Sequence, residues 1–253
     1  NGGSLTVDSI LKMQENSTIS PNSNTLANML PLVLMNGGSL TVNSVVNAQG
    51  NSTINLGGEL LKLDSAVLKA SGPIIDMINS SLTTSPPNGP GLMSFLGSNI
   101  SGVQVVKLDK SVLTVDSGPL LSVTGGSQMS VNGDFASLVN GSKLAVINGP
   151  LIFVDAKSNL TVTGGLVNFG GTGGNQILVK NDIPITGNAG GVSNKLFPIN
   201  VGGSSSITIG PNPVKGDPGG VGNVVSAVSK SGAPNTGVLI QAIGGSNVTI
   251  KAP

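Results

Sequence analysis

The sequence predicts an all-β fold, a right-handed parallel β-helix (β-solenoid), and three observations support that prediction. Residues 1–9 return almost unchanged as residues 36–44. Pairs of aliphatic residues recur along the chain at short, nearly constant intervals. Glycine contributes 38 of the 253 residues, and hydrophobic residues make up 38% of the chain although aromatic residues make up only 2%. Small aliphatic residues suit the narrow interior of a stack of similar coils.

Each expected strand is four or five residues long and alternates in polarity. In residues 4–8, Leu5 and Val7 are predicted to point to one face of the strand, and the polar residues beside them to the other. Glycine is frequent, β-branched residues dominate, and no segment shows a period of 3.6 residues. These features disfavour helices.

The most regular segment lies between Val112 and Val167, where the aliphatic pairs follow one another mostly at intervals of eight residues. The pairs are Leu113/Val115, Leu121/Val123, Met129/Val131, Leu138/Val139, Leu144/Val146, Ile152/Val154, Leu160/Val162 and Leu166/Val167. Ser-Gly, Gly-Gly and Asn-Gly steps between pairs predict turns of about three residues. Three such strands give a three-sided coil of ~23 residues, as between Leu121 and Leu144. Two-sided coils of ~16 residues are the alternative.

The whole chain, residues 1–253, is predicted to form a single solenoid domain. Regular coils are expected to about residue 170, and looser coils with protruding loops over residues 171–253, with loops at 171–174 and 212–220. No membrane span is expected, because the longest apolar run, residues 29–35, is far shorter than the ~20 residues of a spanning helix. The chain begins with Asn rather than Met, which suggests a processed chain or a piece of a longer one.

Composition excludes several classes of function. Histidine, cysteine and arginine are absent. Without them we expect no zinc site of the common kinds, no thiol nucleophile, no Ser-His-Asp triad and no bidentate clamp for phosphate. The net charge of +1 gives no electrostatic footprint for nucleic acid. We therefore predict no metal site, no cofactor and no nucleic-acid partner.

An enzyme acting on polysaccharides is the least favoured function. Glycoside hydrolysis needs two carboxylates ~5–9 Å apart. Asp109 and Asp116 are predicted to lie near adjacent corners of one coil, and we interpret them as solvated turn residues rather than catalytic ones.

Asp182 and Asp217 have surroundings suited at most to a single adventitious calcium ion. The asparagines of the Asn-x-Ser/Thr sequences are interpreted as stacked corner residues: Asn16, Asn51, Asn79, Asn99, Asn140, Asn159 and Asn247.

Three units resemble the bacterial surface β-solenoids of the filamentous-haemagglutinin kind. They are the Ser-x-Leu-Thr-Val units, the segment Gly-Pro-Leu-Leu-Ser-Val-Thr-Gly-Gly-Ser at 118–127, and the segment Asn-Gly-Ser-Lys-Leu-Ala-Val-Ile-Asn-Gly at 140–149. The resemblance covers most of the first 170 residues. It implies an exported, rigid, repetitive protein, extracellular or at the cell surface, that acts as a fibre, adhesin or matrix.

We expect a structural protein that self-assembles into a fibre, sheath or surface layer. The alternative is an adhesin or carbohydrate-binding module with a shallow outer face, although Trp, Tyr and Arg, which dominate binding hot spots, are absent. Both terminal repeats resemble internal ones, so their free strand edges are predicted to contact identical subunits, making the protein a homo-oligomer or filament. The contact residues expected at these ends are Leu5, Val7, Val248 and Ile250.

Some expected strands are apolar on both faces. Strict alternation would leave Leu120, Leu151 and Phe153 on the outside of the solenoid. Either other parts of the same chain cover this face, or a neighbouring subunit does, and the sequence favours neither. These three residues are therefore also candidate subunit contacts.

Overall fold

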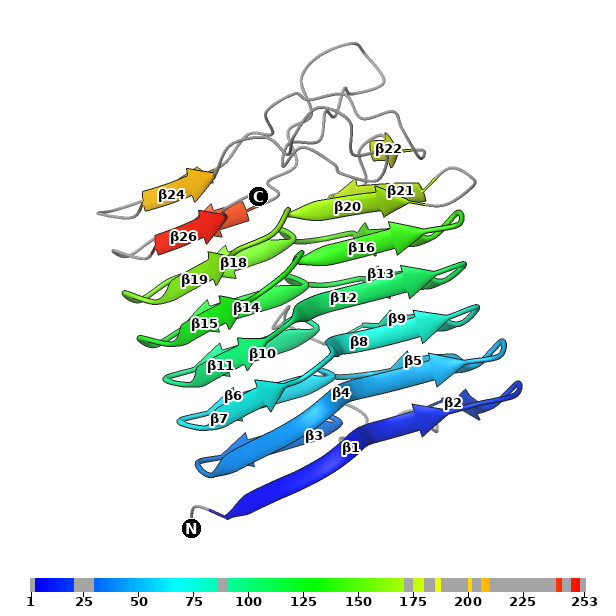
Figure 1. Ribbon diagram of the computed structural model, residues 1–253, viewed down its shortest axis with the longest axis horizontal. Coiled ribbons are helices and arrows are strands. Elements are labelled where there is room, and N and C mark those ends of the chain that lie inside the picture. Colours follow the sequence, from blue (N-terminus) through cyan, green and yellow to red (C-terminus); the bar gives the residue numbers. More distant parts are fainter. Residues whose placement is uncertain are drawn as a thin grey trace.

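The computed structural model describes residues 3–20, 30–85, 91–170, 175–179, 185–187, 200–201, 206–209, 240–242 and 247–250. The regular secondary structure of these described residues consists of strands alone, and the strands stack into a parallel β-solenoid (Figure 1). The described residues therefore contain no helix that could cross a membrane. The all-β solenoid predicted from the sequence is confirmed.

The largest sheet, sheet A, has 12 strands in two columns. Two long strands, β1 (Ser4–Met13) and β4 (Ser39–Gln49), span both columns and join them. The column that we call A1 contains β7 (Val67–Ala70), β11 (Asn99–Gly102), β15 (Gln128–Val131), β19 (Asn159–Val162), β26 (Asn247–Ile250) and β24 (Ser206–Ile209). The column that we call A2 contains β8 (Pro73–Ile78), β12 (Gln104–Asp109), β16 (Ala136–Val139) and β20 (Val167–Gly170).

Two 7-stranded sheets form the other sides. Sheet B contains β2 (Thr18–Ile19), β5 (Thr53–Leu56), β9 (Ser81–Thr84), β13 (Val112–Val115), β17 (Lys143–Val146), β21 (Asn175–Val179) and β22 (Ile185–Gly187). Sheet C contains β3 (Val33–Asn36), β6 (Leu61–Asp64), β10 (Met93–Leu96), β14 (Leu121–Thr124), β18 (Ile152–Val154), β25 (Ile240–Ala242) and β23 (Asn200–Val201). Among the pairings of the described strands, only β21 with β22 is antiparallel.

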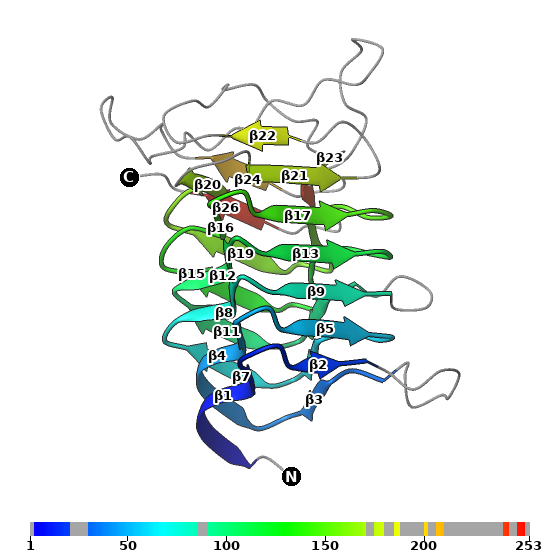
Figure 2. The ribbon, with the colours of Figure 1, turned by 90° about the vertical axis from the view of Figure 1, so that its right-hand side faces the viewer.

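The coil is right-handed, as predicted. In Figure 2, β5, β9, β13 and β17 lie on the near side and run from left to right, while successive coils rise from the N-terminal end. A chain that rises as it passes left to right on the near side winds as a right-handed helix.

The expected coil of ~23 residues is wrong. Residues of neighbouring coils that contact each other are commonly 28, 29, 31 or 32 positions apart, and 35 positions apart between the first two coils. Leu121 pairs with Ile152, and Leu144 pairs with Leu113. The expected pairing of Leu121 with Leu144 does not occur, because they belong to sheets C and B. Each regular coil contributes two strands to sheet A, so a three-sided coil holds four strands.

Inward residues of successive coils stack in ladders, that is, in rows of residues that are paired in register. Seven residues of the regular segment that are predicted to point inward are buried: Leu121, Leu144, Val146, Ile152, Val154, Leu160 and Val162. Their register partners in neighbouring coils are mostly aliphatic, so the parallel strands carry the same kind of side chain from coil to coil. This stacking confirms the inward face that was predicted for these strands.

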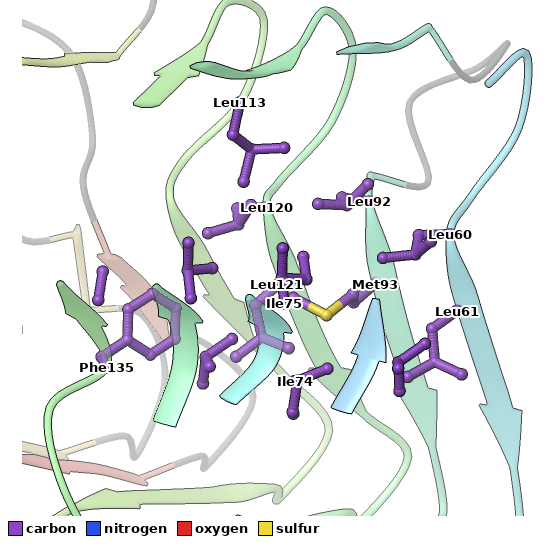
Figure 3. Packing of buried hydrophobic residues seen from close by; sticks show 14 of the residues in the cluster. Leu60, Leu61, Ile74, Ile75, Leu92, Met93, Leu113, Leu120, Leu121 and Phe135 are labelled. Carbon is purple, nitrogen blue, oxygen red and sulfur yellow. The ribbon is translucent and has the colours of Figure 1, made fainter. Parts of the chain in front are cut away.

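The expectation that Leu120 and Leu151 lie outside is wrong, because both are fully buried within the chain. Each immediately precedes a strand of sheet C, at a corner where the regular alternation of the pleat does not apply. Both residues of such a corner pair point inward, as Figure 3 shows for three of them: Leu60 with Leu61, Leu92 with Met93, and Leu120 with Leu121. Phe153 lies within β18 and is only partly buried.

The corner between sheets A and B is held by buried hydroxyl groups. The Ser80 N–H donates to Ser111 Oγ at 3.1 Å, and the Ser111 N–H donates to Ser142 Oγ at 3.2 Å. The Ser142 N–H in turn donates to Asn175 Oδ1 at 3.0 Å. Each of these interactions joins one coil to the next, so the corner residues form a continuous polar ladder beside the apolar core.

Asparagines lie at this corner in several coils, as predicted for stacked corner residues. Asn16, Asn51, Asn79 and Asn140 all have positive φ, a conformation that asparagine tolerates better than most residues. Asn79 Nδ2 donates to Asn51 Oδ1 of the coil below at 2.6 Å. The predicted corner position is confirmed for these four residues, and stacking of asparagine on asparagine for Asn51 and Asn79. The same prediction is wrong for Asn99, Asn159 and Asn247, which lie in strands β11, β19 and β26.

The two ends of the stack differ. β1 pairs with β4, and no described strand lies on its other side. β26 is not an edge strand, because it lies between β19 and β24. The expectation that Val248 and Ile250 belong to a free terminal edge is therefore wrong: residues earlier in the chain, 206–209, pair outside them. The loops expected at 171–174 and 212–220 lie outside the described residues.

Candidate functional site

The first candidate surface is the first coil, formed by β1, β2 and β3. Leu5 of β1 is paired in register with Leu40 of β4, yet Leu5 is 49% exposed and Leu40 is fully buried. Val7 is likewise only partly buried, whereas its register partner Val42 is buried. Residues of core type are therefore accessible at the end of the stack, because no described coil covers them from below.

The apolar surface of the first coil continues onto the outer face of sheet C. Leu34 is 52% exposed, and its register partner in the next coil is the exposed Lys62. Leu30 and Leu32, just before β3, are also exposed. The segment 31–35 thus has apolar side chains that the described part of the chain leaves accessible.

The second candidate surface is a shallow groove of about 330 Å³ on the outer face of column A1. One row of its lining consists of amide side chains from successive coils, Asn99, Gln128 and Asn159. A parallel row consists of hydroxyl side chains, Ser101, Ser130 and Thr161. Val67 and Lys69 extend the two rows into the preceding coil.

The spacing of the strands defines the shape of this groove. The two rows are two residues apart along each strand, which is roughly 6.5 Å, and successive coils are about 4.8 Å apart. The residues between the rows include Ile100 and Met129, which are buried, so the floor there is mostly backbone. The groove therefore runs along the axis of the solenoid, between a row of longer amides and a row of shorter hydroxyls.

Hydrogen bonds order the amide row. Asn159 Nδ2 donates to Gln128 Oε1 at 2.9 Å, and Gln128 Nε2 donates to the Gly126 carbonyl at 3.3 Å. These contacts link neighbouring coils and tie the row to the corner between sheets C and A. Two of the three amides of the row, Gln128 and Asn159, are therefore held in place before any ligand arrives.

The acidic residues contact neighbouring coils as structural groups. Asp109 Oδ1 accepts a hydrogen bond from Asn140 Nδ2 at 2.7 Å, and Asp116 Oδ2 accepts one from Ser85 Oγ. Asp76 Oδ1 lies 3.6 Å from Lys107 Nζ in the next coil. The described residues include no cluster of three His, Cys, Asp or Glu side chains that could hold a metal ion. Asp182 and Asp217 lie outside the described residues.

The structure does not bring the predicted contact residues together. Leu5 and Val7 lie in the first coil, Leu120 and Leu151 in the core, and Phe153 in sheet C. Val248 and Ile250 belong to an interior strand near the other end. The groove was not predicted, although its rows are visible in the sequence as Asn-x-Ser at 99–101, Gln-x-Ser at 128–130 and Asn-x-Thr at 159–161. Aligning them requires the correct coil length.

Comparison of the chain with models of protein families, with curated proteins and with solved structures finds no match.

Proposed function

We propose that the protein is a structural subunit of an extracellular fibre, sheath or surface layer and assembles by stacking the ends of its solenoid. One observation carries the proposal: Leu5 is 49% exposed at a ladder position that is fully buried one coil further on. A strand added below β1 would bury this side chain and pair the free backbone edge. Burial of apolar surface and backbone pairing are two of the contributions that hold neighbouring coils together within the chain.

The occupant that we propose for this edge is a second copy of the chain, in particular its strand β24. β24 lies at the other end of column A1 and has the sequence Ser-Ile-Thr-Ile, which repeats the pattern Ser-Leu-Thr-Val of residues 4–7. In register, serine would stack on serine, threonine on threonine and aliphatic on aliphatic residue. Such a contact joins two different surfaces, so it extends into a filament unless it closes into a ring.

Location at the cell surface is part of the same proposal. It is supported by the resemblance of the repeat units to surface β-solenoids, and by an architecture whose coils repeat one contact along an axis. No catalytic activity is proposed, because the carboxylates at the corners already serve as acceptors between coils.

Cysteine cross-linking tests the contact, since the natural chain contains no cysteine. Variants Thr6→Cys and Thr208→Cys, mixed and oxidised, are expected to form a mixed disulfide, because stacked strands bring Cα atoms within the range of a disulfide. Thr83→Cys, on the outer face of sheet B, replaces Thr208→Cys in the matched control. Negative-stain images of the natural chain are expected to show filaments.

Three results would contradict the proposal. One is a chain that stays monomeric at high concentration in analytical ultracentrifugation. A second is a mixed disulfide that forms no more readily with Thr208→Cys than with Thr83→Cys. The third concerns Thr6→Cys alone. If Thr6→Cys instead reacts only within a longer natural polypeptide, a preceding coil of that polypeptide covers β1 and the self-assembly proposal fails.

A second candidate function is carbohydrate binding on an outer face. The groove on column A1 favours it, because uncharged amides and hydroxyls both donate and accept hydrogen bonds, as the hydroxyl groups of sugars do.

A further inference from the structure

We propose that the groove on column A1 binds a linear, neutral polysaccharide that lies parallel to the solenoid axis. The inference rests on the second candidate function and deepens it by naming the ligand class, its direction and the residues that contact it. The amide row is Asn99, Gln128 and Asn159, and the hydroxyl row is Ser101, Ser130 and Thr161.

The neutrality of the ligand follows from the charges of the groove. Lys69, at its lower end, is the one charged residue among those that line it. An anionic polymer such as a polyuronate would place a carboxylate at every sugar or every second sugar. Only one of these carboxylates could pair with Lys69, and the others would lose solvation without gaining a counter-charge. A neutral polysaccharide has no charged groups, so it loses no comparable solvation on binding.

The direction of the ligand follows from the arrangement of the two rows. A chain that runs along the axis meets an amide on one side and a hydroxyl on the other in three successive coils, at intervals of about 4.8 Å. A chain that runs along a strand leaves the groove after crossing one amide and one hydroxyl. The repeat of polar groups therefore matches a repeating ligand only when the two axes are parallel.

The ligand must be a polymer because each contact is weak. The groove is lined by no aromatic residue, so a single sugar ring has nothing to stack on. Hydrogen bonds exchanged with water contribute only about 1 kcal/mol each. Successive sugars of one chain bind with the effective concentration of linked ligands, so affinity rises with the number of coils engaged.

Affinity gel electrophoresis of the natural 253-residue chain tests the inference. The probes are hydroxyethyl cellulose, a soluble β-1,3-glucan and dextran as neutral polymers, polygalacturonate as an anionic polymer, and glucose as the monomer. We expect at least one neutral polymer to retard the protein, polygalacturonate to retard it less, and glucose not to compete at concentrations at which the polymer does.

Two variants locate the site. Ser130→Gln narrows the groove, and Asn99→Ala removes an exposed amide that the fold does not need. Each is expected to weaken polymer binding about tenfold with an unchanged melting temperature. Thr83→Gln and Thr114→Gln are the matched controls, because each replaces a hydroxyl residue on the outer face of sheet B with glutamine. Both controls are expected to bind the polymer as the natural chain does.

The outcomes separate the inference from the function on which it rests. If none of the three neutral polymers binds, both the inference and carbohydrate binding by this face are wrong. If a neutral polymer binds but the groove variants bind it as well as the sheet B variants do, the site is wrong. If polygalacturonate binds more tightly than every neutral polymer, or if glucose competes as well as a polymer, the ligand class is wrong.

Discussion

The first and second coils carry nearly the same sequence but have different surroundings. Residues 1–9 and 36–44 differ at one position, and β1 and β4 pair in register from Ser4 with Ser39 to Met13 with Ala48. Among the described strands, β4 has a neighbour on both sides, whereas β1 has a neighbour on one side. The same leucine is therefore fully buried in one coil and about half exposed in the other.

This difference shows that burial in a solenoid is a property of the stack rather than of the repeat. Each coil contacts only the coils above and below it, so its stability is the sum of its own contribution and of those two interfaces. A terminal coil lacks one interface. It should open first, and a second copy that supplies the missing interface should stabilise it most.

The largest effect is expected in an interior ladder. Leu144→Asp buries a charge without a partner beside Leu113 of the preceding coil, because Leu144 is buried in β17. We expect a loss of more than about 4 kcal/mol in the free energy of unfolding, enough to prevent folding of the central coils. Circular dichroism during urea denaturation measures it. A variant that unfolds at the same urea concentration as the natural chain would contradict the inward register of sheet B.

A matched pair of truncations compares the two coils directly. Leu40→Ala leaves a cavity at a fully buried position and is expected to cost about 2–5 kcal/mol. Leu5→Ala, at the paired position of the first coil, is expected to cost about 1 kcal/mol or less in the monomer. Thermal and urea unfolding of both variants at low protein concentration measures the difference. Equal losses would mean that the first coil is covered in solution.

A smaller effect than in the interior ladders is expected at the polar corner. Ser111→Ala removes the hydroxyl oxygen that accepts a hydrogen bond from the Ser80 N–H. Because Ser80 is buried, its N–H is then left without an acceptor. We expect a cost of about 1–3 kcal/mol. Ser17→Ala in the first coil also removes a corner hydroxyl, one that donates to the Gln14 carbonyl, but water can replace it there. Hydrogen exchange of the Ser80 amide reports the change, and protection as strong as in the natural chain would contradict it.

Local pattern was sufficient to predict the strands and their inward faces. In β14, Leu121 and Val123 alternate with polar residues, and alternation is a property of the strand alone. The number of strands in a coil is not local. It depends on the angle at each corner, and the corner between columns A1 and A2 keeps both strands in one sheet, which lengthens the coil by one strand. The 35-residue repeat of residues 1–9 carried this signal, as did the repeat of Gly-Pro-Leu at 118–120 and 149–151.

The candidate surfaces were predictable in unequal measure. Leu5 and Val7 could be placed in the first coil because their segment repeats an internal one. The amide and hydroxyl rows could not be assembled, because Asn99 and Asn159 become neighbours of Gln128 only when coils of 29 and 31 residues are aligned. Leu120 and Leu151 were misplaced for a different reason: they lie at corners, where backbone direction rather than pleat decides which way a side chain points.

The variable length of the coil has a consequence for how this chain tolerates insertions. The connection from sheet B to sheet C takes up four residues between β5 and β6, five between β13 and β14 and eight between β9 and β10, whereas the connection from sheet C to sheet A takes up two residues after β6 and β10, three after β14 and four after β18. Strands on either side of the longer connections keep the same register with their neighbours. Additional residues are therefore accommodated at one edge of the solenoid without disturbing its stacking. That edge is a natural point for displaying a foreign segment at a fixed height along the axis.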